Sequence, residues 1–171
     1  MPASNPLTAI DLLIRDQILH LPFLAALWKN AGKVQAFDRK VDIRRNFEDA
    51  ILAGSRALVV PRGMTISPNF SSGSMRFRLR YDIACYSGKM TIEDIRLLEW
   101  GVALACTRLY QGIGPDGSPL DANAAAPLVI ETFNVGEVEE DRQRVDMPEE
   151  WESVTQLTVF ADGDKAALAA L

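Results

Sequence analysis

Residues 76–86 read Arg-Phe-Arg-Leu-Arg-Tyr-Asp-Ile-Ala-Cys-Tyr, and this stretch decides the fold class of the 171-residue chain. Its odd-numbered positions are apolar and most of its even-numbered positions are polar. Successive side chains of a β-strand point to opposite faces, so an alternation of this length predicts a strand with one face on a core. The other face carries Arg76, Arg78 and Arg80, a row of positive charge that faces water or a partner.

A helix from Ile92 to Tyr110 is predicted directly after this strand. Thr91 followed by Asp94 is a typical start signal, because a threonine side chain accepts a backbone N–H of the first turn. Apolar residues then recur at spacings of three and four, which is the pattern of a helix with one buried side. That side comprises Ile92, Ile95, Leu98, Val102, Ala105 and Leu109. It is expected to pack on the apolar strand positions Phe77, Leu79, Tyr81, Ile83 and Cys85.

Shorter patterns on both sides of this pair predict the remaining elements. Residues 7–19 form an amphipathic first helix with Thr8 as its expected cap, and Asn46 caps a second short helical pattern. Apolar or alternating runs predict strands at residues 57–60, 128–135 and 151–160. Residues 30–45 fit a loop or an irregular strand equally well. Glycine, proline, serine or acidic composition predicts loops at residues 62–74, 111–126 and 137–150.

This order of elements predicts a single α+β domain over residues 1–171. Consecutive strands without helices between them favour a mostly antiparallel sheet of four strands, or slightly more, with the helices packed on one face. The loops 111–126 and 137–150 are expected to project from the body. A chain of this length buries enough apolar surface to fold without a metal or a disulfide.

Composition and charge narrow the classes of function. The net charge is -5, which disfavours a dedicated nucleic-acid binder. Apolar stretches fall far short of the ~20 residues that cross a bilayer, and the N-terminus lacks a secretory pattern, so a protein without membrane association is expected. Cys85 and Cys106 lie in apolar segments and are expected to be reduced core thiols, although a bond between them stays open.

No residue set predicts a catalytic, cofactor-binding or metal site. The single histidine, His20, precludes a site with several histidines and is expected to contact the carbonyl groups at a helix end. Gly112, Gly114 and Gly117 match a dinucleotide-type spacing, but they follow a helix and are interrupted by prolines, so that motif is rejected. We therefore expect a protein that is not an enzyme.

Charged residues form two candidate contact surfaces. The arginine row is either a solvated sheet face or one half of a contact between subunits. Its complement would be the acidic group, which is Glu137, Glu139, Glu140 and Asp141. Carboxylates of this kind could also hold Mg²⁺ or Ca²⁺, although their spacing is not that of a calcium loop and a solvated turn is favoured.

The arrangement of these elements resembles the tail terminator (tail completion) proteins of long-tailed bacteriophages. The resemblance rests on the helical start at residues 7–19, the strand 57–61 with the loop 62–74, the long strand 76–86 and its helix 91–110. The strands 128–135 and 151–160, separated by the acidic projection, complete it. It covers most of the chain as an order of elements rather than as a signature motif.

The resemblance implies a structural virion protein made in the host bacterial cytoplasm. Such a protein forms a homo-oligomeric ring, expected to be a hexamer, that caps the tail tube and stops its polymerisation. Its implied partners are the tail tube protein, the head–neck connector and, in a contractile tail, the sheath. DNA would pass through the lumen without specific binding. The alternatives are another neck or head–tail adaptor protein, a small enzyme with a metal at the acidic group, and a bacterial interaction module.

Overall fold

The computed structural model describes residues 5–21, 34–36, 45, 57–68, 73–86, 92–143, 151–164 and 166. It confirms the predicted α+β class. The helices are α1 (Pro6–Leu19) and α3 (Ile92–Tyr110), and the strands are β1 (Val34–Ala36), β2 (Ala57–Pro68), β3 (Ser74–Tyr86), β4 (Leu128–Gln143) and β5 (Trp151–Asp164). The short helix expected after Asn46 lies outside the described residues.

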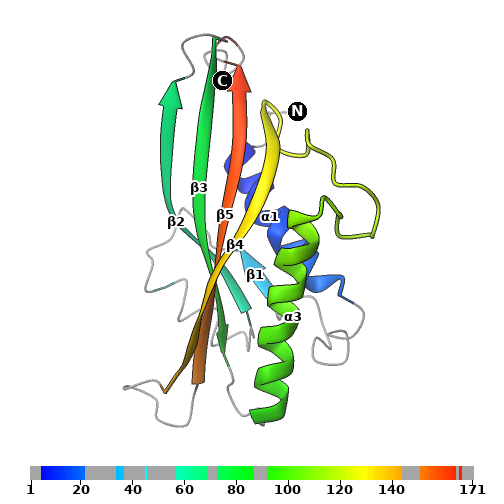
Figure 1. Ribbon diagram of the computed structural model, residues 1–171, viewed down its shortest axis with the longest axis vertical. Coiled ribbons are helices and arrows are strands. Elements are labelled where there is room, and N and C mark those ends of the chain that lie inside the picture. The colour runs from blue at the N-terminus through cyan, green and yellow to red at the C-terminus, as the bar shows by residue number, and fades with distance from the viewer. Residues whose placement is uncertain are drawn as a thin grey trace.

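Within the described ranges, the strands form one sheet in the order β1-β2-β3-β5-β4. Four of them, β2, β3, β5 and β4, pair antiparallel, as the sequence predicts. The fifth, β1, is only three residues long and pairs parallel with the start of β2. It comes from the segment that the sequence left open between loop and strand. Figure 1 shows the four long strands side by side in the upper half of the molecule, with α3 beside β4.

Strand β3 has the buried face and the exposed face that its alternating sequence predicted. Phe77, Leu79, Tyr81, Ile83 and Cys85 are buried in one core cluster, whereas Arg76, Arg78 and Arg80 are exposed on the opposite face. The same cluster contains residues of both helices, so α1 and α3 cover the same face of the sheet. Their buried residues are Ile10, Ile14 and Ile18 in α1 and Leu98, Val102, Ala105, Cys106 and Leu109 in α3.

Strand β2 is longer than predicted, and the loop expected over residues 62–74 is wrong for residues 62–68 and for Ser74. Pro61 was expected to end the strand because proline cannot donate to a ladder. A register shift between Pro61 and Gly63 absorbs Arg62, and pairing with β3 then continues to Pro68. A β-bulge of this kind keeps two strands together across a residue that would otherwise interrupt them.

Strands β4 and β5 also continue past their predicted ends. Residues 137–143, which we expected at the start of a projecting loop, belong to β4. Register shifts between Val135 and Val138 and between Glu139 and Arg142 let this acidic stretch stay paired with β5. Strand β5 ends at Asp164 rather than at residue 160.

The start of α1 differs from the prediction, whereas the stretch after α3 agrees with it. The cap of α1 is Asn5, whose Oδ1 accepts a hydrogen bond from the Leu7 N–H at 3.0 Å, so the prediction of Thr8 was wrong. Pro6 follows as the first helical residue, where a missing N–H costs nothing. Residues 111–126 lie outside the helices and strands, as predicted, apart from a single bridge between Ile113 and Pro119.

Gly136 provides a test of the bulge in β4. A Cβ added there would lie 3.0 Å from Gln156 Cβ and 3.4 Å from its carbonyl oxygen, and neither atom is the end of a flexible side chain. We expect Gly136→Ala to lower the free energy of unfolding by about 1 kcal/mol. Gly63→Ala is the matched control, because its Cβ would meet only the Arg80 guanidinium at 3.5 Å. Equal urea midpoints for the two variants would contradict the close approach at Gly136.

Candidate assembly surface

Arg76, the first residue of the arginine row, is already paired within its own chain. Its Nη2 lies 3.0 Å from Glu131 Oε1 on β4, and its Nε lies 3.2 Å from Asp162 Oδ1 on β5. The hydrogen bond to Asp162 and the charge of Glu131 raise the pKa of Arg76 above its ordinary value. The structure therefore assigns this guanidinium an intramolecular partner on each of two neighbouring strands. Neither carboxylate could be identified from the sequence, because only the strand register brings them to Arg76.

Arg78 and Arg80 stand further along the same exposed face of β3. The Arg78 guanidinium lies 5.9 Å from the centre of the Phe160 ring, a cation–π distance. Arg80 lies beside Gly63, at the bulge in β2. Arg62, which the bulge displaces, forms an ion pair with Asp82 at 2.5 Å. The arginine row thus extends from β3 onto the edge of β2, and Arg62 belongs to the same basic surface.

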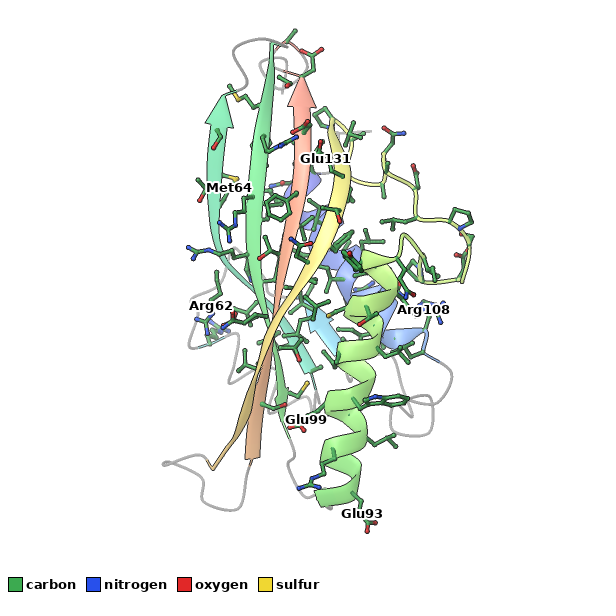
Figure 2. All side chains as sticks on the ribbon, in the orientation of Figure 1. Arg62, Met64, Glu93, Glu99, Arg108 and Glu131 are labelled. Carbon is green, nitrogen blue, oxygen red and sulfur yellow. The ribbon has the colours of Figure 1, made fainter. Side chains whose placement is uncertain are left out.

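The end of β2 is exposed on both of its faces. Pairing opposite Leu79 and Phe77 places Met64 and Ile66 on the helix-bearing face, yet their side chains remain 48% and 46% exposed. Thr65 and Ser67 on the other face are exposed as well. A pocket of about 200 Å³ opens beside this stretch. It is lined by Leu7, Pro61, Arg62, Gly63, Met64, Leu79, Arg80 and Tyr81. In Figure 2, Arg62 and Met64 lie along β2, at the edge of the sheet that is farther from α3.

The four residues of the acidic group lie at a different level of the sheet from the arginine row. Glu137, Glu139, Glu140 and Asp141 belong to the second half of β4, and Glu139 stands in register with Val154 and, across β5, with Ala84. Arg80 is in register with Thr158 and Asn134 instead. The structure therefore does not bring the row and the acidic group together within one chain. Their side chains fall outside the described residues, so a metal there stays untested.

The other candidate residues have structural surroundings. His20 Nδ1 lies 2.7 Å from the Asp16 carbonyl oxygen at the end of α1, the helix-end contact that the sequence predicted. Gly112 and Gly117 have φ values of 72° and 85°, which suit the turns after α3 and do not open a helix. Among the described residues, no three His, Cys, Asp or Glu side chains converge as metal ligands. Over the same ranges, no helix is long and apolar enough to span a bilayer.

Both cysteines are buried and no disulfide joins them, which answers the question that the sequence left open. Cys85 faces the core from β3, and Cys106 faces it from α3. Burial raises the pKa of the Cys106 thiol to about 12, because the thiolate would lose its hydration. A thiol in that state is a poor nucleophile at neutral pH. Cys106 is therefore a packing residue.

Asp116 provides a pH test of the loop after α3. Hydrogen bonds from the Ser118 hydroxyl, at 2.6 Å, and from its N–H, at 3.0 Å, lower the pKa of Asp116 below its ordinary value. A carboxyl whose pKa is lower in the folded state stabilises the turn at any pH above its unfolded-state pKa. This stabilisation is lost as the pH falls through its folded-state pKa. We expect Ser118→Ala to raise the pKa of Asp116 in a carboxyl NMR titration, whereas Ser118→Thr, which keeps the hydroxyl, should leave it low. An unchanged titration in Ser118→Ala would contradict the hydrogen bond.

The fold is thus an α+β sheet whose helices cover one face and whose opposite face carries the arginine row. No family model and no curated protein sequence matches this chain. Among solved structures, it is similar to a chain from the virion of a native gene transfer agent (GTA) particle. The match has a TM-score of 0.59 at 8% sequence identity, and it covers 92% of this chain and 97% of the other. At this identity, the two chains are shown to share a fold.

Proposed function

We propose that this chain is a structural virion protein that closes the end of a phage tail tube. The observation that carries the proposal is the shared fold with a chain of a gene transfer agent virion, over nearly the full length of both chains. The order of elements that resembles tail terminators supports the same role. In this role the protein forms a homo-oligomeric ring on the last tube layer, stops polymerisation and joins the tail to the head–neck connector.

The chemistry of the surface is consistent with assembly. A sheet face that combines arginines with a partly exposed aromatic ring is a common composition of protein interfaces. A net charge of -5 suits a ring around DNA, because a lumen that repels phosphate lets the duplex slide. In a contractile tail, the sheath would be a further neighbour of the outer surface.

The test is polymerisation of a purified phage tail tube protein, with and without this protein. We expect added protein to shorten the tubes and a gold-labelled antibody against it to mark one tube end in negative-stain images. Tubes of unchanged length, with the label on isolated heads, would favour a head–tail adaptor instead. Label scattered along the tube walls would contradict both roles.

A further inference from the structure

We propose that the end of β2 is a docking edge for a second copy of this chain, and that it binds the outer edge of the neighbour's β4. This inference deepens the proposed function, since a ring needs two different surfaces on each subunit that fit each other. The two edges stand at opposite sides of the sheet order, β2 next to the short β1 and β4 at the far end. They therefore meet head to tail between neighbouring copies.

The exposed end of β2 has the properties of an unprotected strand edge. Within the described residues, β1 pairs only with Ala57, Leu58 and Val59, so no described strand pairs on that side beyond Val59. Four consecutive residues, 64–67, are exposed, and two of them are the apolar Met64 and Ile66. Soluble proteins usually place charges or bulges at such edges to prevent pairing with other chains. Strand β2 has both at Arg62, but residues 64–67 beyond it have neither. An apolar pair at an open edge indicates that another strand covers it.

Among the described residues, no strand pairs with the outer edge of β4 over its second part. Near its start, the Ile130 N–H donates to the Ala122 carbonyl oxygen at 2.8 Å, so the loop after α3 occupies the edge there. Further along, Asn134, Val135 and Gly136 are exposed, and Val135 lies on the helix-bearing face. Strand β4 then continues to Gln143 with no described strand on its outer side.

Strand direction and face both agree with this pairing. Strand β2 runs antiparallel to β3, which runs parallel to β4 because both pair antiparallel with β5. In a cyclic ring whose strands run along the ring axis, strand directions are the same from copy to copy. The new contact is then antiparallel, the more stable ladder. It also keeps Met64 and Ile66 on the side of the sheet that carries the neighbour's α3. That helix packs mainly on β4, and its Trp100 is 61% exposed.

Charge complementarity selects a second copy as the occupant. The β2 side of the sheet carries Arg62, Arg78 and Arg80 at its surface, while the chain as a whole is acidic with 23 acidic against 18 basic residues. The acidic group of the sequence belongs to the second half of β4, the edge that we pair with β2. Opposite charges at the two edges favour head-to-tail contacts over β2–β2 or β4–β4 contacts, in which like charges meet.

The experiment compares self-association of the wild type and two variants by light scattering after size exclusion. We expect the double variant Met64→Lys, Ile66→Lys to raise the dissociation constant about a hundredfold, because lysines on an edge strand oppose pairing. Val129→Lys is the matched control, since Val129 is a β4 residue of similar exposure, 44%, on the sheet face away from the contact. Circular dichroism melts should show both proteins folded.

A mixing experiment tests the head-to-tail geometry. Val135→Lys blocks the β4 side, and Met64→Lys with Ile66→Lys blocks the β2 side. Each blocked protein alone should be monomeric, while a mixture of the two should form a heterodimer and nothing larger, because each still has one open edge. Absence of the heterodimer, or wild-type protein that stays monomeric at millimolar concentration, would overturn the proposal.

Failure of the docking edge and failure of the proposed function give different results. A ring that survives Met64→Lys with Ile66→Lys and still shortens tubes overturns the edge and leaves tail closure in place. An assembly that needs the β2 edge but does not change tube length overturns tail closure and leaves the edge in place.

Discussion

Replacing Leu98 with alanine is expected to lower the free energy of unfolding by about 3 kcal/mol, within a range of ~2–5 kcal/mol. Leu98 is fully buried in the middle of the core cluster, on the helix that contacts β4, β3 and β5. Truncation removes several methyl and methylene groups from contact and leaves a cavity that the sheet cannot close. The measurement is urea denaturation of the variant and of the wild type at one protein concentration.

Leu97→Ala is the matched control for this variant. Leu97 is the preceding residue of the same helix and is 38% exposed, so its loss should cost less than about 1 kcal/mol. The comparison holds residue type, helix propensity and position along α3 nearly constant. Equal losses at the two positions would show that α3 does not bury the side facing the sheet.

Replacing Gln17 with alanine is expected to cost about 2 kcal/mol, because it leaves buried polar groups without partners. Gln17 in α1 is 1% exposed. With its amide oriented to match its neighbours, its nitrogen donates to the carbonyl oxygens of Ile113 and Gly114 at 3.3 Å, and its oxygen accepts from Arg108 Nε at 3.3 Å. The Gln17 side chain thus links α1 by hydrogen bonds to the end of α3 and to the loop that follows. Figure 2 shows Arg108 near that end of α3.

Gln111→Ala is the matched control for Gln17→Ala. Gln111 is an exposed glutamine in the same loop, and its loss should change the free energy of unfolding by less than about 0.5 kcal/mol. Limited proteolysis provides a second readout, since cleavage within residues 111–120 should become faster in Gln17→Ala than in Gln111→Ala. Identical stability and identical cleavage in both variants would contradict the polar contact.

The order of elements and the main core could be predicted because the signals that specify them are local. The bounds of α3 were predicted to the residue, since its apolar spacing is regular and its flanks are polar. Strand lengths were underestimated at Pro61, Val135 and Phe160. At each of these positions, a proline or a change in the apolar pattern predicted the end of the strand. The chain nevertheless stays paired there with the neighbouring strand. In β2 and β4, bulges make this possible, and their positions depend on the partner strand.

The candidate surface was predictable only in part. The exposure of Arg76, Arg78 and Arg80 follows from alternation within β3. The partners of Arg76 do not, because Glu131 and Asp162 lie 55 and 86 residues away in the chain. The exposed edge at Met64 and Ile66 was not predicted either, because those residues were expected in a loop.

The sequence by itself determined that residues 76–86 have a core face and a charged face, and that α3 packs on the core face. Both statements depend on periodicity, which a strand or helix carries within its own residues. Only the tertiary structure decided which arginine pairs with carboxylates, how far β2 and β4 extend, and that no described strand pairs with the outer edges of their later parts. Those properties depend on register between strands distant in the sequence, and a shift of one residue would exchange the two faces of a strand.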